Sequence, residues 1–162
     1  MSNKTFYIFR HGLATKSLFG YGDKIVTAEL LAEGKPPIEK MANYLKKIPS
    51  QFNVCSEFVR CRQTAAIVTK KTGKKFTFDK RLNEYNEESF NDLRDRVKDF
   101  LQYIEKSNYQ SVLICTHGAV IAAIKNLVLR NKFTLFQLYD YPKTGVLLVI
   151  KDGKIEEIDF NE

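Results

Sequence analysis

The two histidines of this chain follow the same local pattern. His11 comes after the apolar run 5–9 and a single arginine, Arg10, whereas His117 comes after the apolar run 111–115 and a single threonine. A glycine directly follows each histidine. Apolar runs of this length predict buried strands, and open α/β sheets bind their ligands outside the carboxyl ends of such strands. We therefore predict that Arg10, His11 and His117 meet at one site.

These residue types suit the transfer of a phosphoryl group. A neutral imidazole can attack phosphorus and form a phosphohistidine, which divides hydrolysis into two easier displacements. The oxygens of the transferred group carry negative charge, and a guanidinium group can bind two of them at once. A helix expected just after Gly118 would add backbone N–H groups and the positive end of its dipole. The chemistry therefore points to a phosphate site.

The hydrophobic periodicity predicts strands that alternate with helices up to about residue 130. We expect strands at 5–9, 52–55, 76–78 and 111–115, and helices at 36–48, from about 61, at 89–106 and from about 119. The C-terminal part differs, because strands 144–150 and 154–160 flank Asp152-Gly153, a hairpin signal. We predict one α/β domain over residues 1–162: a three-layer α/β/α sandwich with a mostly parallel sheet and an antiparallel hairpin at its C-terminal edge.

Composition narrows the class of protein. The 26 Lys and Arg against 19 Asp and Glu give a net charge of +7, which favours anionic partners such as phosphate esters. The lysines are dispersed, so we expect no nucleic-acid partner. No apolar stretch is long enough for a membrane span and no signal peptide is evident, so we expect a cytoplasmic protein without membrane contact.

The three cysteines, Cys55, Cys61 and Cys115, show no CxxC pair. Their odd number and spacing match neither a disulfide framework nor a usual metal site, so we expect small buried side chains. We accordingly expect no metal and no cofactor. The sequence contains no pattern that predicts an oligomeric state.

Three motifs in order resemble those of the histidine phosphatase superfamily, also called phosphoglycerate mutase-like. They are Arg10-His11-Gly12, then Ser56 followed by Arg60 and Gln63-Thr64-Ala65, and finally Thr116-His117-Gly118. The resemblance implies that His11 is the nucleophile that becomes phosphorylated. It also implies that Arg10, Arg60 and His117 hold the phosphoryl oxygens.

A proton donor for the leaving group is also required, and the same group could later activate water. In the family a glutamate often follows the third strand in a Leu-x-Glu pattern, which Leu82-Asn83-Glu84 resembles. We therefore select Glu84 as the catalytic acid. Glu87 and Glu88 are close enough in sequence to remain alternatives.

The sequence departs from the family pattern around the predicted site. Glu57 stands where proline is common, Cys61 where alanine is common, and Leu13-Ala14 where an acidic residue and threonine are frequent. Ser17 stands where an asparagine often touches phosphate. The loop 13–23 is long for a turn and is either a substrate loop or an ordinary surface loop. These changes bear on substrate identity and rate rather than on the four central residues.

We therefore predict a metal-independent phosphatase acting on a small phosphorylated metabolite or on a phosphoprotein, for instance at phosphohistidine. The short segment between Glu84 and His117 leaves no room for the large insertion that family mutases usually carry, so a phosphoglycerate-type mutase is the weaker alternative. A catalytically weak phosphate-binding regulatory module is the alternative from another class. Retention of His11 argues against it, because a binding module needs no nucleophile.

Overall fold

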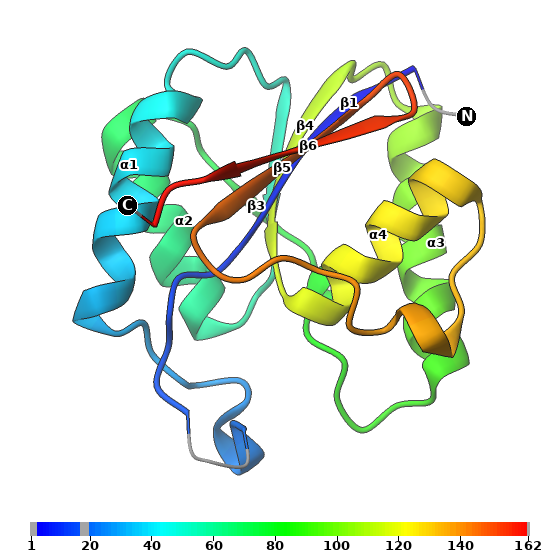
Figure 1. Cartoon of the computed structure of the whole chain (residues 1–162), viewed down its shortest axis with the longest axis horizontal. Coiled ribbons are helices and arrows are strands. Elements are labelled where there is room, and N and C mark those ends of the chain that lie inside the picture. Colours follow the sequence, from blue (N-terminus) through cyan, green and yellow to red (C-terminus); the bar gives the residue numbers. More distant parts are fainter. Residues whose placement is uncertain (1–2, 17–19, 162) are drawn as a thin grey trace.

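A single six-stranded sheet organises the computed structural model, which describes residues 3–16 and 20–161. The strands are β1 Thr5–Arg10, β2 Phe52–Cys55, β3 Thr77–Phe78, β4 Ser111–Thr116, β5 Val146–Lys151 and β6 Lys154–Asp159, in the spatial order β3-β2-β4-β1-β5-β6. Strands β1 to β4 run parallel, and β5 and β6 complete the sheet as an antiparallel hairpin (Figure 1). The predicted mixed sheet with a C-terminal hairpin is confirmed.

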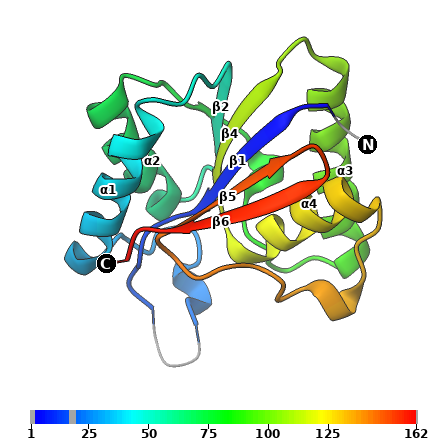
Figure 2. The same cartoon turned by 45° about the horizontal axis from the view of Figure 1, so that its top comes forward.

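Helices cover both faces of this sheet (Figure 2). On one face lie α1 Lys35–Leu45 and α2 Val59–Thr72, and on the other lie α3 Phe90–Lys106 and α4 Gly118–Arg130. Alternate strand residues point to opposite faces: Phe9 packs in the cluster with α1 and α2, and Ile8 in the cluster with α3 and α4. The α/β sandwich class predicted from the sequence is therefore correct. None of the helices in the described part of the chain is long and apolar enough to cross a membrane.

The register of the parallel strands aligns the ends that carry the histidines. Phe9 pairs with Cys115 and Arg10 with Thr116, and the backbone N–H of His11 donates to the Thr116 carbonyl at 3.1 Å. Strand β2 ends at the same level, because the Ser56 N–H donates to the Cys115 carbonyl at 3.0 Å. The residues after β1, β2 and β4 consequently share one edge of the sheet, as the strand-end argument requires.

Some element boundaries differ from the sequence predictions. Helix α1 ends at Leu45 although the apolar stripe continues to Ile48, and β3 contains only Thr77 and Phe78. Helix α2 begins at Val59, so Arg60 lies in its first turn rather than in the preceding loop. Boundaries of this kind depend on local hydrogen bonds that periodicity does not report.

Helix α4 is buried on more sides than its apolar stripe predicted. We expected one inward face, yet nearly every residue from Gly118 to Leu127 is buried. The reason is the segment 133–141, which crosses the outer side of the helix: Phe133 and Leu138 belong to the same core cluster as α4. Asp140, in this segment, forms an ion pair with Lys125 of α4 at 2.6 Å, which holds the segment against the helix.

Candidate active site

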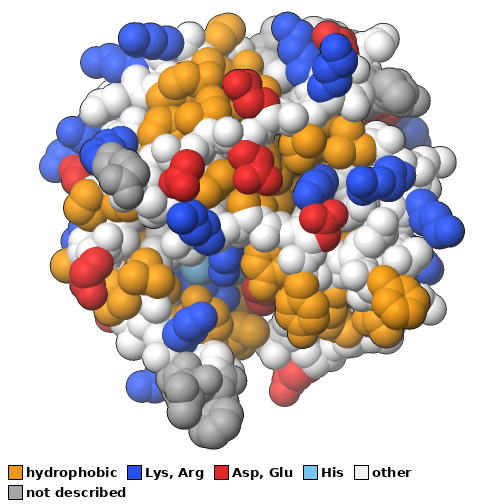
Figure 3. Space-filling model, in the orientation of Figure 1, with side chains coloured by type: hydrophobic (Ala, Val, Ile, Leu, Met, Phe, Trp, Pro, Cys, Tyr) orange, Lys and Arg blue, Asp and Glu red, His pale blue; other side chains and the backbone are white. Residues whose placement is uncertain are grey.

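Four side chains that are distant in sequence lie together at the carboxyl edge of the sheet. The rings of His11 and His117 are 5.3 Å apart, and Arg60 reaches both of them from α2. Its Nε donates to His11 Nε2 at 3.1 Å, and its Nη2 lies 3.2 Å from His117 Nδ1. Figure 3 shows histidine atoms at the bottom of a recess between Lys and Arg side chains.

Arg60 is a fully buried cation without an acidic partner. Across residues 3–16 and 20–161 no carboxylate forms an ion pair with it. Besides the two imidazoles it donates to the Ile25 carbonyl, and the ring of Tyr21 lies 4.0 Å from its Cζ. Burial lowers the pKa of Arg60, since removing a charge from water disfavours it. An anion arriving here would supply the missing counter-charge.

Arg10, at the end of β1, adds a second cation. Its Nη1 donates to the Pro142 carbonyl at 3.4 Å, and its Cζ lies 5.0 Å from the centre of the Tyr141 ring. Its Nε is buried and has no hydrogen-bond partner, alone in this respect among the buried side-chain nitrogens and oxygens of the described residues. A buried donor without a partner is costly, which makes this N–H a candidate contact for a ligand oxygen.

His11 is held as a neutral ring with one unprotonated nitrogen. Its Nδ1 lies 2.7 Å from the carbonyl of Gly12, which can only accept, so Nδ1 carries the proton. Nε2 is then left with a lone pair, which faces Arg60. Burial, assisted by the charges of His117 and Arg60, lowers the pKa of His11 from 6.5 to about 3. An unprotonated Nε2 is what nucleophilic attack on phosphorus requires.

His117 is fully buried between β4 and α4. Its Nε2 lies 2.8 Å from Ser56 Oγ and 3.4 Å from Cys61 Sγ, and its Nδ1 faces Arg60. The ring of Phe58 packs against it with centroids 5.2 Å apart. Both ring nitrogens therefore have polar neighbours: Nε2 contacts Ser56 and Cys61, and Nδ1 faces the guanidinium of Arg60.

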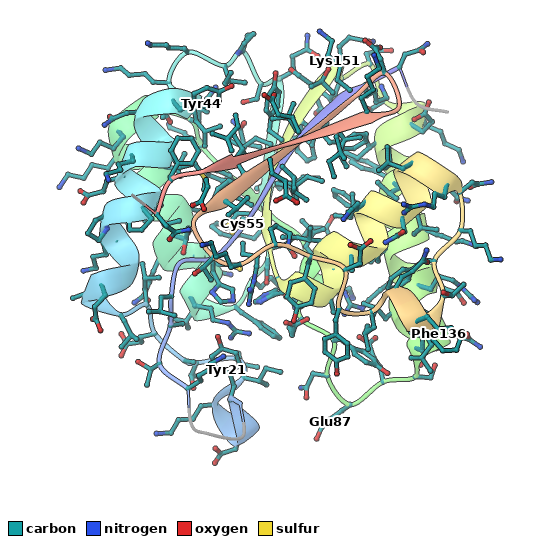
Figure 4. The ribbon with its side chains drawn as sticks, in the orientation of Figure 1. Tyr21, Tyr44, Cys55, Glu87, Phe136 and Lys151 are labelled. Carbon is teal, nitrogen blue, oxygen red and sulfur yellow. The ribbon has the colours of Figure 1, made fainter. Side chains whose placement is uncertain are left out.

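The structure separates the three glutamates that the sequence left as candidates for the acid. Glu88 pairs with Arg96 at 2.6 Å, and Glu87 extends into solvent (Figure 4). Glu84 is half-buried, and its carboxylate adds to the rise that burial causes in the pKa of Tyr21, the residue stacked on Arg60. Of these three carboxylates, Glu84 is thus the one whose charge acts on the site.

The remaining sequence predictions around the site can now be placed. All three cysteines are buried and free, as expected. Residues 17–19, including Ser17, lie outside the described residues. The described part of loop 13–23 reaches the site through Tyr21, which precedes a short 3₁₀ turn at Gly22–Lys24. In the sequence, Tyr21 stands between two glycines, and this pattern does not predict that its ring covers Arg60.

Sequence reasoning also missed the partners of His117. Ser56 entered only as the first residue of a motif, and Asn83 only as the middle of Leu82-Asn83-Glu84, yet Ser56 Oγ is 2.9 Å from Asn83 Oδ1. Tyr141, which covers Arg10 and also packs on Gly118, carried no pattern at all. These contacts are tertiary, so no local spacing could have indicated them.

Comparison with known proteins decides the family. The model of the histidine phosphatase superfamily (branch 1) matches residues 6–87 and 85–161. This chain belongs to that superfamily. Membership confirms the expectation of a phosphatase of the histidine phosphatase type, and the match extends over nearly the whole sequence. No curated protein matches the chain in sequence.

Solved structures of this superfamily's fold resemble the chain over almost its full length. A putative alpha-ribazole-5'-P phosphatase from Escherichia coli superposes with a TM-score of 0.79 at 16% identity, covering 98% of this chain and 97% of the other. A mycobacterial glucosyl-3-phosphoglycerate phosphatase in complex with VO3 gives 0.74 at 16%, covering 98% of both chains. The protein histidine phosphatase SixA complexed with tungstate gives 0.69 at 18%, covering 95% and 94%. At these low identities, the TM-scores establish a common fold.

Proposed function

We propose that this protein hydrolyses a phosphomonoester, or a phosphorylated protein side chain such as phosphohistidine, through a phosphohistidine on His11. Arg10, Arg60 and His117 bind the phosphoryl oxygens, and Glu84 is the proton donor. The observation that carries the proposal is the buried Arg60 guanidinium between two imidazoles, without a carboxylate partner among the described residues. A buried charge in that state is poorly compensated until an anion binds.

The proposed reaction uses these residues in two steps. The Nε2 lone pair of His11 attacks phosphorus, the bond from phosphorus to the leaving oxygen breaks, and Glu84 gives its proton to that oxygen. The Glu84 carboxylate then takes a proton from water, whose oxygen attacks the phosphohistidine. Inorganic phosphate leaves, and Nε2 regains its lone pair. The arginines hold the phosphoryl charge through both steps.

Hydrolysis fits the chain better than mutase transfer. Between Glu84 and His117 the structure places only α3, β4 and their connections, with no added layer over the sheet edge. The similar structures named above comprise an enzyme for a small phosphorylated metabolite, one for a sugar phosphoglycerate and one for phosphohistidine in proteins. Two of these enzymes act on small metabolites and one acts on a phosphoprotein, and we propose the same two substrate classes for this protein.

The test is hydrolysis of para-nitrophenyl phosphate by the purified full chain, with and without a chelator. We expect chelator-resistant turnover, inhibition by vanadate and tungstate, and loss of turnover in His11→Ala. Acid-labile, alkali-stable labelling from a ³²P-phosphorylated substrate should appear in the wild type and not in that variant. Oxyanion binding without turnover at any pH would favour the phosphate-binding module instead.

A further inference from the structure

The amide of Asn83 has only one orientation that its neighbours allow. The backbone N–H of Glu57 lies 2.9 Å from Asn83 Oδ1, and an N–H can only donate. The oxygen of the amide must therefore face this N–H, and the nitrogen faces Glu57 Oε1 at 3.1 Å. One amide oxygen is thus fixed toward the end of β2.

This fixed acceptor determines where the Ser56 hydroxyl points. Ser56 Oγ lies 2.9 Å from the same Oδ1, which has no proton to give, so the hydroxyl must donate to it. Ser56 Oγ also receives the Phe58 N–H at 3.2 Å. Its single proton is used, and its one remaining neighbour, His117 Nε2 at 2.8 Å, can only donate to it.

The proton of neutral His117 is thereby assigned to Nε2. Nδ1 keeps its lone pair and faces the Arg60 Nη2, which is a donor, so the two sides of the ring agree. The nearby Cys61 sulfur also fits, because its S–H points to the Thr116 carbonyl at 3.6 Å and leaves its lone pairs for Nε2–H. The contacts of Asn83, Ser56 and Arg60 therefore agree on one tautomer of His117.

We propose that Asn83 is a positioning residue that sets the tautomer of His117 through the Ser56 hydroxyl. The inference rests on the proposed function, since it concerns how one phosphate-binding imidazole is prepared. Asn83 Oδ1 accepts the Ser56 hydroxyl proton, so the hydroxyl cannot donate to His117. The ring therefore keeps Nε2–H toward Ser56 and its unprotonated Nδ1 toward Arg60. Nδ1, without a proton, then accepts from Arg60 Nη2 and holds the guanidinium between the two imidazoles, where the phosphoryl group is proposed to bind.

Replacing Asn83 with alanine frees the hydroxyl. Ser56 can then rotate and donate to Nε2, and the proton of His117 moves to Nδ1 in part of the molecules. The conservative variant Asn83→Asp keeps an oxygen acceptor at the same place and restores the original arrangement. It is always combined with Glu57→Gln, so that its second oxygen meets an amide N–H instead of the Glu57 carboxylate. Asn43→Ala, an exposed asparagine on α1, is the matched control for loss of one asparagine side chain.

Long-range ¹H–¹⁵N spectra of the two imidazoles in untagged protein test this directly. The chain has only two histidines, and the structure assigns them opposite tautomers, Nδ1–H for His11 and Nε2–H for His117. We expect Asn83→Ala to shift only the His117 nitrogens toward a mixture, while Asn83→Asp and Asn43→Ala leave them unchanged. An unchanged His117 spectrum in Asn83→Ala would overturn the proposal.

Kinetics supply the second readout. For Asn83→Ala we expect kcat/KM on para-nitrophenyl phosphate to fall about tenfold, which corresponds to about 1.4 kcal/mol, with recovery in Asn83→Asp. The reason is that a proton on Nδ1 would face the Nη2 donor of Arg60 and displace the guanidinium. A loss that Asn83→Asp does not recover would overturn the rescue that the proposal requires. The two proposals fail separately: a tautomer shift in a protein that never turns over substrate would overturn only the hydrolytic function.

Discussion

The two strand-histidine-glycine segments are nearly alike in sequence and opposite in hydrogen bonding. His11 gives its Nδ1–H to the carbonyl of the next residue and leaves the Nε2 lone pair toward Arg60. His117 gives its Nε2–H to Ser56, across to the neighbouring strand, and leaves Nδ1 toward Arg60. In the proposed mechanism, a local partner therefore prepares one imidazole as the nucleophile, and a tertiary partner prepares the other as an acceptor that holds Arg60 in place.

The glycines after the two histidines also serve different neighbours. A Cβ on Gly12 would lie 2.8 Å from the Gly34 carbonyl oxygen and 2.7 Å from a Leu30 methyl group. A Cβ on Gly118 would lie 2.3 Å from the ring of Tyr141, the residue that covers Arg10. Both positions need glycine because another segment approaches closely. Similar motifs at two strand ends thus reflect two separate packing constraints.

The largest expected effect separates the two histidines in the covalent step. His11→Ala removes the attacking nitrogen, so we expect turnover to fall by at least about 10³-fold and no phosphoenzyme to form. His117→Ala removes one contact to the phosphoryl group, with a loss of about 10²-fold while labelling of His11 persists. Rapid-quench labelling with ³²P measures both. Equal loss of labelling in the two variants would contradict the division of roles.

Arg60→Met tests the cation that joins the two imidazoles. We expect vanadate affinity to fall by about a hundredfold, because a charge-assisted contact to the oxyanion is lost. Stability should change by less than about 1 kcal/mol, because the desolvation cost that is removed with the buried charge offsets the cost of leaving its three acceptors without this donor. Calorimetry of binding and thermal unfolding measure the two effects. A large loss of stability would show that Arg60 is structural.

The candidate acids should separate by phenotype. Glu84→Gln is expected to lower kcat/KM about tenfold for substrates with poor leaving groups and to change kcat/KM little for para-nitrophenyl phosphate. The reason is that kcat/KM reports the phosphorylation step alone, in which this leaving group needs no proton. Glu88→Gln should instead leave kcat unchanged and lower the melting temperature, because it breaks the half-buried pair with Arg96. The reverse pattern would move the acid to Glu88.

His11 should also make stability depend on pH. Its folded-state pKa of about 3 lies below its ordinary value of 6.5, so between these values the unfolded chain binds the extra proton. Stability contributed by the neutral ring is therefore present above pH 6.5 and is lost as pH falls toward 3, by about 1 kcal/mol per unit where the loss is steepest. Denaturant titrations should show a flatter pH profile for His11→Gln. Parallel profiles would contradict this assignment.

The smallest expected effect concerns the cysteine beside His117. Cys61→Ala removes a sulfur 3.4 Å from Nε2 but leaves the Ser56 contact at 2.8 Å. We expect kcat/KM to change by less than about twofold and stability to fall by about 1 kcal/mol from the lost packing. Steady-state kinetics and unfolding curves measure the two. A large kinetic loss would show that the sulfur contributes to the position of the ring.

The sequence predicted those features that have a local cause. Apolar periodicity located the main strands and helices, the Asp152-Gly153 turn located the hairpin, and both its residues indeed adopt positive φ angles of 53° and 73°. The convergence of Arg10, His11 and His117 followed from strand ends in a parallel sheet. Three other features could not be predicted, because they depend on segments that meet only in the folded chain. They are the packing of segment 133–141 on α4, the stacking of Tyr21 on Arg60 and the contacts of Asn83.

The contacts that fill the site also bear on how readily it would release its product. Without a ligand, the guanidinium of Arg60 still has the nitrogens of both imidazoles and a backbone carbonyl as acceptors. When inorganic phosphate departs, these acceptors reoccupy the donors, so little hydrogen bonding is lost in the vacated centre. The empty centre thus keeps its hydrogen bonds between cycles, while the uncompensated charge of its guanidinium keeps its affinity for the next anion.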